Sequence, residues 1–569
     1  MRIATFFLLS AVLFLSNCRQ TQPVQDYEAV YSTVFDSAAV VSAHPLSSEV
    51  GLDILKAGGN AVDAAVAVQF ALAVVCPRAG NIGGGGFLVY RRADGFANTL
   101  DYREKAPAAA YRDMYLDSLG NIVDGMSTRG HRAAGVPGTV AGLVDAHDRY
   151  GKLPWAELVA PAIRLAEAGF PITITEAERL NRYADDFREF NEAPNPFLKD
   201  TPWQEGDLLR QPELAATLRL IQERGRAGFY AGHTADLIVA EMESGDGLIT
   251  RQDLLDYRPV WREPLIDEYR QYRVISMPPS SSGGVALLQM LEMIEPYPLA
   301  SYGFQSTTAT HLMVEAERRA YADRAEYLGD MDYYPVPLDS ILNDAYLMAK
   351  MEDFKPGVAT LSDSLGKTDI VVRKESFETT HTSVVDAEGN AVSLTTTLNS
   401  NYGCKVMVDG AGFFLNNEMD DFSSKPGVPN QFGLVGAEAN AIGPGKRMLS
   451  SMTPTIVERD GELYLVLGAP GGSTIITAVF QVFVNVSSFG MPLDSAIRAP
   501  RFHHQWLPDE IWVEPTALSP AVRDSLSAMG HHFSEKQSMG RIKAIHRLTD
   551  GRLHAGADAR NPDDDVAGY

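Results

Sequence analysis

The chain has 569 residues, of which 45% are hydrophobic and 21% are charged, and its formal net charge is −24. A chain of this length is long enough to bury a substantial core. A surface this acidic repels phosphate backbones, so we expect no nucleic-acid partner. The acidity excludes that class of partner without identifying a substrate.

The N-terminus predicts export. Met1-Arg2 provides a short positive start, and residues 3–16 form a nearly continuous apolar run. This run is too short to span a bilayer as a helix but suits a signal peptide within residues 1–18. It ends at Leu15-Ser16-Asn17-Cys18, which resembles the lipobox of bacterial lipoproteins, in which the cysteine becomes acylated. The resemblance implies an envelope (periplasmic) protein anchored through Cys18, with residues 19–38 as tether and start of the mature chain.

Plain secretion remains the alternative to that lipid anchor, because Asn17 stands where a lipobox usually has a small residue. Apart from Cys18, the cysteines are Cys76 and Cys404, with no CxxC pair or Cys/His cluster. Neither a zinc site nor a disulfide framework is predicted, and we favour two buried free thiols over a single bridge. Four histidines considered as metal ligands lack ligand spacing: His44, His381, His503 and His504. We expect no metal and no cofactor.

The first part of the chain is helix-rich. Residues 46–75 predict two helices separated at Gly58-Gly59-Asn60, and the second is so uniformly small and apolar that we expect it to be buried against a sheet. Four glycines, residues 83–86, precede a strand and lack a lysine, which favours close backbone packing over phosphate binding. Further helices are predicted at residues 139–150, 155–168, 211–224, 286–294 and 309–327.

A polar segment, residues 361–378, separates this part from a strand-rich last part. It is either a surface loop or a processing site. Beyond it, two β-rich runs flank Ala387-Glu388-Gly389, and Gly389 stands where a hairpin loop needs a left-handed residue. A hairpin centred on Glu388 places Thr379 directly opposite Thr397, with their Cβ atoms roughly 5 Å apart.

The same register separates the two faces of the hairpin. One face is apolar and suits a core, whereas the other carries hydroxyl groups and His381. A threonine-rich edge strand facing water would explain the second face. A catalytic site would also explain it: if the peptide bond before Thr379 were cut, the freed α-amino group would be a base, with a pKa near 8, on the same residue as the hydroxyl nucleophile.

From about Ala39 to its end, the chain resembles the γ-glutamyltransferases (γ-glutamyltranspeptidases) of the N-terminal-nucleophile hydrolase superfamily. The resemblance is carried by ordered motifs along the chain. They are Gly80-Asn81-Ile82-Gly83-Gly84-Gly85-Gly86-Phe87, Asp101-Tyr102-Arg103-Glu104-Lys105-Ala106-Pro107, Ala134-Gly135-Val136-Pro137-Gly138-Thr139, Pro278-Pro279-Ser280-Ser281-Ser282-Gly283-Gly284, Tyr321-Ala322-Asp323-Arg324-Ala325-Glu326-Tyr327, Thr379-Thr380-His381, Asn416-Asn417-Glu418-Met419-Asp420-Asp421-Phe422, Leu449-Ser450-Ser451-Met452 and Pro470-Gly471-Gly472-Ser473.

This resemblance implies an α/β (α+β) fold, a four-layer αββα sandwich. It implies a precursor that cleaves itself between Glu378 and Thr379, giving a large subunit (residues 39–378) and a small subunit (residues 379–569) that fold together as a heterodimer. Thr379 would be the nucleophile that forms an acyl-enzyme, and Thr397 its hydroxyl partner.

The family's other functional residues also have matches here. Gly471 and Gly472 match the oxyanion hole. Arg103 matches the arginine for the substrate's α-carboxylate, and Asp421 matches the carboxylate for its α-ammonium. Further polar contacts are expected from Asn399, Glu418, Ser450 and Ser451. Phe432 lies in the stretch that matches the lid loop, where some relatives carry a tyrosine whose hydroxyl latches the lid.

The implied activity is cleavage of γ-glutamyl amides such as glutathione and transfer of the γ-glutamyl group to water, amino acids or peptides. Two alternatives remain. A cephalosporin-acylase-like amidohydrolase would share the nucleophile but accept glutaryl-type donors without an α-ammonium, against which Asp421 argues. A non-catalytic envelope scaffold would be favoured if Thr379 or the glycine pair were missing, and they are present.

Overall fold

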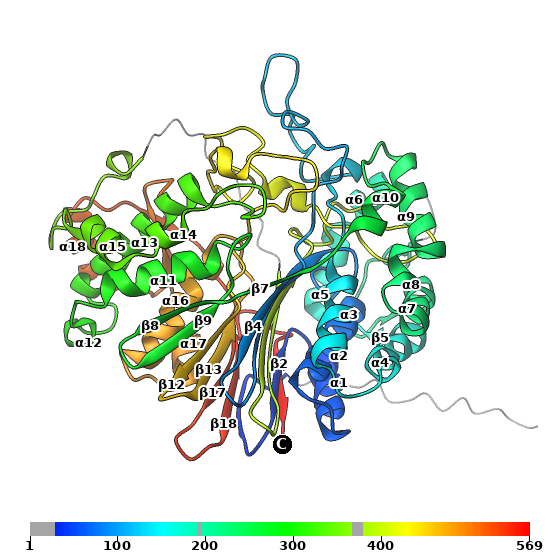
Figure 1. Cartoon of the computed structure of the whole chain (residues 1–569), viewed down its shortest axis with the longest axis horizontal. Helices are drawn as coiled ribbons and strands as arrows, with labels where there is room; N and C mark the ends of the chain where they lie inside the picture. Colours follow the sequence, from blue (N-terminus) through cyan, green and yellow to red (C-terminus); the bar gives the residue numbers. More distant parts are fainter. Residues whose placement is uncertain (1–28, 192–194, 367–378) are drawn as a thin grey trace, which may run out of the picture.

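Two stacked β-sheets form the centre of the protein, with helices covering both outer faces (Figure 1). The structure, a computed structural model, describes residues 29–191, 195–366 and 379–569. Its layers follow the order α-β-β-α, which confirms the predicted fold class. The predicted signal peptide, Cys18 and Glu378 lie outside the described residues. Within the described part of the chain, no helix is long and apolar enough to cross a membrane.

Each sheet has seven strands, and every neighbouring pair in these two sheets is antiparallel. The first has the order β1 (Ser32–Phe35), β18 (Leu553–Ala557), β17 (Lys543–Arg547), β13 (Glu462–Gly468), β12 (Thr455–Arg459), β9 (Tyr272–Ser276), β8 (Leu265–Tyr269). The second has the order β19 (Asp565–Gly568), β2 (Ala39–Ser42), β10 (Thr380–Val385), β11 (Ala391–Thr397), β3 (Gly85–Arg91), β4 (Ala97–Asp101), β7 (Val260–Arg262). Both sheets therefore contain strands from before and from after residue 379.

The outer face of the second sheet is covered by the first helical layer. Its innermost helix, α2, is buried along its whole length and packs on α1, α4, β10 and β11, as its uniformly apolar sequence predicts. The helices in this part of the chain are α1 (Pro45–Lys56), α2 (Ala61–Val75), α3 (Thr139–Tyr150), α4 (Trp155–Ala168), α5 (Ile174–Arg182), α6 (Ala184–Phe190), α7 (Pro212–Arg224), α8 (Ala227–Tyr230), α9 (Gly232–Ser244) and α10 (Arg251–Asp256).

The other helical layer covers the first sheet, and α13 and α16 cross it beside α11 (Figure 1). Its members are α11 (Gly283–Ile294), α12 (Leu299–Tyr302), α13 (Thr307–Tyr327), α14 (Leu338–Ile341), α15 (Asp344–Met351), α16 (Thr474–Ser487), α17 (Leu493–Arg498) and α18 (Pro520–Ala528). Two small sheets lie outside the sandwich: β14 (Phe502–His503) with β15 (Ile511–Val513) and β16 (Phe533–Glu535), and β5 (Phe170–Pro171) with β6 (Leu208–Leu209).

The hairpin of β10 and β11 has the predicted register. Thr380 pairs with Thr396 and Val385 with Ala391, so the turn is centred on Glu388, and Gly389 has a φ of 88°. The face that carries hydroxyl groups lies between the two sheets, where the Ser383 and Ser393 hydroxyls donate to carbonyl groups of β17 and β13. The alternative of a threonine-rich edge strand facing water is therefore wrong, because both strands are central and buried.

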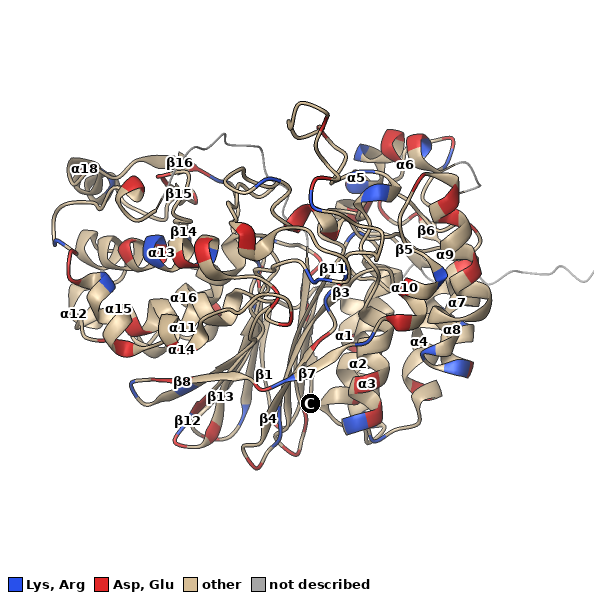
Figure 2. Cartoon of the chain, turned by 45° about the horizontal axis from the view of Figure 1, so that its top comes forward, with Lys and Arg blue, Asp and Glu red and all other residues tan. Residues whose placement is uncertain are grey.

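Charged side chains lie mainly on the outer helices and at the hairpin turns, while the stacked strands carry few (Figure 2). Cys76 and Cys404 are free, buried thiols, as predicted. Burial raises the pKa of the Cys404 thiol to about 12, which keeps it protonated and unreactive.

The run of four glycines allows close approach of backbones, as predicted. A Cβ on Gly84 would lie 2.0 Å from the carbonyl oxygen of Thr397, and one on Gly86 would lie 2.3 Å from that of Thr395. No side chain fits between β3 and β11 at these two positions. The glycines therefore set the distance between β3 and the end of β11 that carries Thr397.

We expect Gly84→Ala to destabilise the protein by ~1–3 kcal/mol, because the added methyl group has to displace backbone rather than a flexible side chain. The measurement is the midpoint of unfolding, followed by fluorescence. Gly443→Ala is the matched control, since a Cβ at Gly443 meets only the Lys446 side chain at 3.8 Å. Equal midpoints for the two variants would contradict the packing role of Gly84.

Candidate active site

Thr379 lies at the start of β10 and is 7% exposed. Its hydroxyl donates to the Thr397 Oγ1 at 3.3 Å, across the hairpin. The Thr397 oxygen also accepts the backbone N–H of Asn399 at 2.7 Å. The structure thus brings together the two threonines that the hairpin register predicted, and a hydrogen-bonded partner restricts the rotamer of the Thr379 hydroxyl.

Asn399 connects this pair to the neighbouring loop. Its backbone has a positive φ of 73°, and its side-chain amide donates to the carbonyl of Asn417 at 3.0 Å. In turn, the side chain of Asn417 accepts the N–H of Ser400 at 2.9 Å. These contacts hold the chain that follows β11 against the loop that carries Glu418, so Asn399 both lines the pocket and maintains its wall.

Gly471 and Gly472 immediately precede α16 and have φ values of 142° and 56°, a region that favours glycine. Within the described residues, neither backbone N–H donates a hydrogen bond. The N-terminus of a helix carries partial positive charge, so these groups suit a developing negative charge. The Tyr321 hydroxyl of α13 donates to the carbonyl of Ser473 at 2.5 Å and braces this turn. Gly472, but not Gly471, lines the pocket with Thr379.

The Arg103 guanidinium is fully buried and contacts three carboxylates. Its Nη1 lies 2.6 Å from Glu418 and 3.5 Å from Glu104, and its Nη2 lies 2.5 Å from Asp421. The same guanidinium donates to the carbonyl groups of Met448 and Leu449. The residues expected to bind the substrate's carboxylate and its ammonium are therefore in contact with each other in this structure.

Burial is the largest influence on the pKa values of Arg103 and its three carboxylate partners. Burial lowers the pKa of Arg103, but the carboxylates of Glu418, Glu104 and Asp421 outweigh that effect and raise its pKa. Burial raises the pKa of Glu104 to about 8, although Arg103 opposes the change. The pKa values of Glu418 and Asp421 are raised for the same reason. Crowding three carboxylates around one guanidinium favours a proton on at least one of them.

Ser450 and Ser451 line the same pocket, where they meet a residue that the sequence analysis did not assign to the site, Arg324 of α13. Its Nη2 donates to the Ser451 hydroxyl at 3.2 Å and its Nε to the Ser282 hydroxyl at 2.9 Å. Arg324 belongs to one of the quoted motifs, but α13 is buried nearly all round, so periodicity does not distinguish a pocket residue there from a core residue.

Phe432 covers the pocket at the glycine turn. The ring lies so close to Gly472 that a Cβ there would be 2.8 Å from it, and the Phe432 side chain is buried. The Asn430 side chain accepts the N–H of Phe432, and Gln505 donates to its carbonyl. The pocket is lined by Arg103, Arg324, Thr379, Thr397, Asn399, Glu418, Asp421, Phe432, Leu434, Ser450, Ser451, Met452, Gly472 and Ile475.

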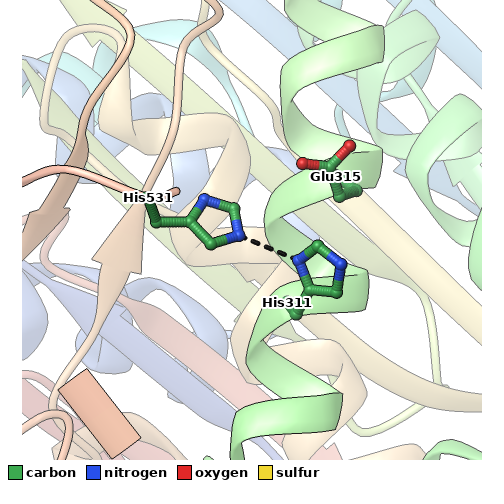
Figure 3. A group of neighbouring side chains, drawn as sticks. All are labelled: His311, Glu315 and His531. Carbon is green, nitrogen blue, oxygen red and sulfur yellow. Dashed lines mark hydrogen bonds between the residues drawn. The ribbon is translucent and has the colours of Figure 1, made fainter. Parts of the chain in front are cut away.

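One group elsewhere, His311, Glu315 and His531, has the spacing of metal ligands among the described residues (Figure 3). The His311 Nε2–H donates to the Lys355 carbonyl, so its Nδ1 accepts the Nε2–H of His531 at 2.8 Å. The Glu315 oxygens are occupied by Arg319 and by the N–H of Thr360. His311 and His531 are hydrogen-bonded to each other and Glu315 is paired with Arg319, whereas the buried Nδ1 of His531 has no hydrogen-bond partner among the described residues. None of the four histidines considered in the sequence belongs to this group.

Thr379 directly precedes a central strand of a two-sheet sandwich and shares a pocket with Gly472, which lies just before α16. This is the arrangement of the N-terminal-nucleophile hydrolases, and the fold places the protein in that class. The family model described as gamma-glutamyltranspeptidase matches residues 47–568. The chain belongs to the γ-glutamyltranspeptidase family.

Individual relatives agree with this assignment. The chain is 46% identical to a glutathione hydrolase proenzyme of Escherichia coli (strain K12), over 100% of this chain and 99% of the relative. A cephalosporin acylase from Bacillus halodurans superimposes with a TM-score of 0.81 at 27% identity, covering 97% of this chain and 98% of that one. The Helicobacter pylori gamma-glutamyltranspeptidase gives a TM-score of 0.56 at 42% identity, covering 61% and 99%.

The raised pKa of Glu104 predicts how the stability of the protein depends on pH. Because its folded pKa of about 8 exceeds the usual 4.5, the folded protein keeps a proton that the unfolded chain releases between pH 4.5 and pH 8. This carboxyl group therefore lowers the stability of the wild type as pH rises through that window. Glu104→Gln cannot titrate, so we expect the variant to gain at least ~1 kcal/mol relative to wild type between pH 5 and pH 8.

The measurement is the difference in free energy of unfolding between variant and wild type at the two pH values. Glu205→Gln, a change at an exposed position, is the control and should give the same difference at both. A Glu104→Gln difference that is independent of pH would mean that the carboxyl group is already ionised at pH 5.

Proposed function

We propose that the chain is a precursor that cleaves itself before Thr379, and that the mature protein is a γ-glutamyltransferase. It would hydrolyse γ-glutamyl amides such as glutathione and transfer the γ-glutamyl group to amino acids or peptides. The observation that carries the proposal is the hydrogen bond from the Thr379 hydroxyl to Thr397, inside a pocket that also contains Arg103 and Asp421. Residues 39–378 and 379–569 would be the two subunits of the heterodimer.

The first chemical step is acylation. The α-amino group of the cleaved Thr379 takes the hydroxyl proton while Oγ1 attacks the γ-carbonyl carbon of the donor. The negative charge that develops on the carbonyl oxygen is stabilised by the N–H groups of Gly471 and Gly472. As the tetrahedral intermediate collapses, the C–N bond breaks, the leaving amine takes the proton, and the γ-glutamyl group stays on Thr379 as an ester.

The second step reverses the first with a new nucleophile. Water or an acceptor amine attacks the ester carbon, its proton passes to the α-amino group, and the Thr379 hydroxyl is regenerated. Hydrolysis and transfer therefore use the same residues and differ in the molecule that enters. The cover that Phe432 provides over Gly472 would influence which molecule reaches the ester.

Recognition depends on the two charges of the γ-glutamyl group. Its α-carboxylate suits the arginine side of the pocket, with Ser450 and Ser451, and its α-ammonium suits Asp421, Glu418 and Asn399. A substrate that brings one charge of each sign replaces the contact between Arg103 and Asp421 without changing the net charge of the site. This exchange lowers the cost of opening a buried ion pair.

The likeness to a cephalosporin acylase makes an amidohydrolase for glutaryl donors the second candidate. Such donors keep a carboxylate but lack the α-ammonium, which would leave the Asp421 carboxylate without a cationic partner in the occupied pocket. The acidic side of this pocket favours the γ-glutamyl donor. Export through residues 1–18, with anchoring at Cys18 in the bacterial envelope, is part of the same proposal and rests on the sequence pattern alone.

Replacing the nucleophile tests the catalytic proposal. We expect the wild type to split into two chains, the smaller beginning Thr379-Thr380-His381, and to release anilide from a γ-glutamyl anilide. Thr379→Ala should remain a single chain with at least a ~10³-fold lower rate, because no other hydroxyl replaces the nucleophile. Denaturing gels, N-terminal sequencing and the anilide assay measure these outcomes.

Thr379→Ser is the matched control, since it keeps the hydroxyl and should still be cleaved. A folded wild type that stays whole and inactive would overturn the proposal in favour of a non-catalytic scaffold. Activity in uncleaved Thr379→Ala would show that another residue carries the reaction.

Substitutions of Phe432 test whether the lid controls the balance between hydrolysis and transfer. Phe432 has no hydroxyl, so its side chain covers Gly472 by apolar contact alone. Phe432→Tyr should raise the ratio of transfer to hydrolysis about two- to tenfold, because one added hydrogen bond contributes ~0.5–1.5 kcal/mol to closure. The ratio is read from anilide release with and without a dipeptide acceptor, and Phe432→Leu is the apolar control. An unchanged ratio in Phe432→Tyr would mean that this residue does not control access.

A further inference from the structure

The side chain of Asn81 lies between α2 and β3 and is 4% exposed. Its Oδ1 accepts the backbone N–H of Gly84 at 2.9 Å and the hydroxyl of Thr139 at 2.8 Å. Its Nδ2 donates to the carbonyl of Thr397 at 2.9 Å and to that of Ala79 at 2.9 Å. One buried amide therefore joins the run of glycines, the start of α3 and the end of β11.

These partners settle the orientation of the amide. The N–H of Gly84 can only donate and the carbonyl of Thr397 can only accept, so a flipped Asn81 amide would place like groups against each other at both contacts. In the orientation present, both ends of the amide are hydrogen-bonded. A buried polar group that is satisfied in this way is rigid, so Asn81 is suited to hold the Thr397 backbone in one position.

The glycine at position 84 leaves the space that this amide occupies. A Cβ on Gly84 would lie 2.7 Å from the Asn81 Oδ1, in addition to its clash with the Thr397 carbonyl. The start of α3 donates two backbone N–H groups to the Gly84 carbonyl, which holds the glycine from another side. Gly85 and Thr397 are the last residues that pair between β3 and β11. Asn81 therefore continues the connection between these two chain segments beyond the end of their strand pairing.

Thr397 links this frame to the nucleophile. Its carbonyl accepts from Asn81, while its hydroxyl accepts from Thr379 at 3.3 Å and from the N–H of Asn399 at 2.7 Å. A shift of the Thr397 backbone moves its hydroxyl as well, because both groups belong to one residue at the end of a strand. Asn81 is not among the residues that line the pocket, so it is not placed to contact a substrate there.

We propose that Asn81 is a positioning residue for the nucleophile: by holding the Thr397 carbonyl, it fixes the hydroxyl that accepts the hydrogen bond from Thr379. The proposal rests on the γ-glutamyltransferase function proposed above. It applies to self-cleavage and to turnover alike, since both use the Thr379 hydroxyl. It also gives the run of glycines a role in the reaction, because Gly84 is the residue that lets the Asn81 amide reach Thr397.

Asn81→Asp tests this role in the full-length protein. The variant has nearly the same shape and keeps an acceptor for Gly84, but an ionised carboxylate has no hydrogen to donate to the Thr397 carbonyl. A misplacement of ~1 Å can slow a reaction ~100-fold, so we expect the rate of self-cleavage and the kcat of the cleaved enzyme to fall about 10- to 100-fold. KM for a γ-glutamyl anilide should stay within about threefold of wild type, since the charged side of the pocket is untouched.

Asn60→Asp is the matched control, because it removes the same kind of bond at the other end of the hairpin. The Asn60 amide donates to the Tyr150 carbonyl at 2.7 Å, and its oxygen caps α2, which an aspartate also does. The first N–H of α2 donates in turn to Asp386 in the hairpin turn. We expect Asn60→Asp to lower the unfolding midpoint while self-cleavage and kcat stay within about twofold of wild type.

A second comparison tests whether Asn81 acts through the Thr397 hydroxyl. In a Thr397→Val background that hydroxyl is gone, so Asn81→Asp should lower kcat less than about twofold further. Thr139→Val, which removes one support of the Asn81 oxygen, is the milder variant if Asn81→Asp does not fold, and we expect a two- to fivefold loss of kcat. An unchanged kcat, an equal loss in Asn60→Asp, a KM that rises as much as kcat falls, or additive losses with Thr397→Val would each overturn the proposal.

Failure of this proposal is distinguishable from failure of the proposed function. If the wild type itself neither splits nor releases γ-glutamyl anilide, the catalytic function is wrong and the role of Asn81 falls with it. If the wild type splits and is active, and Asn81→Asp splits and turns over at the wild-type rate, only the role of Asn81 is wrong.

Discussion

The pairing of β10 with β11 is the constraint on which the rest of the site depends. Its register places Thr379 opposite Thr397, and a slip of one strand by one residue would place the two hydroxyls on opposite faces of the sheet. The hairpin is held in register by its turn, by β2 on one side and by β3 on the other. The close contact of Gly84 with the Thr397 carbonyl then keeps the end of β11 close to the chain that leads into β3.

The pocket is built around charges that the protein does not fully balance by itself. Burial opposes the ionisation of Glu104, Glu418 and Asp421, and their proximity to Arg103 offsets only part of that cost. Arg324 lines the same pocket and donates to the hydroxyls of Ser282 and Ser451. A substrate that carries both an ammonium and a carboxylate complements these charges, and a plain acyl chain does not.

The local sequence pattern was sufficient to predict part of this structure. The turn at Gly389 and the alternation of the flanking runs predicted the register of the hairpin, and the uniform apolarity of residues 61–75 predicted the burial of α2. The resemblance added the site residues, most of which line one pocket, although Gly471 does not. Local pattern did not decide whether the hydroxyl-lined face met water, because that depends on a second sheet built from distant strands.

The remaining features depend on contacts between segments far apart in the chain. The ion pair of Arg103 with Asp421 joins residues 318 positions apart, and the contact of Arg324 with Ser451 joins residues 127 positions apart. The periodicity of the sequence does not predict contacts between residues so far apart in the chain. Arg324 was not predicted as a pocket residue for a further reason. A helix that is buried nearly all round shows the same sequence pattern whether a residue faces a core or a pocket.

The sheet topology explains how a cut before Thr379 is compatible with one intact molecule. In the second sheet β10 lies between β2 and β11, and in the first sheet β12 lies between β9 and β13. Each of these ladders joins strands from the two sides of the proposed cut, so separating the subunits would require breaking both sheets. A new N-terminus at Thr379 would thereby be held in place by the backbone hydrogen bonds of β10, with its α-amino group beside the hydroxyl that we propose it deprotonates.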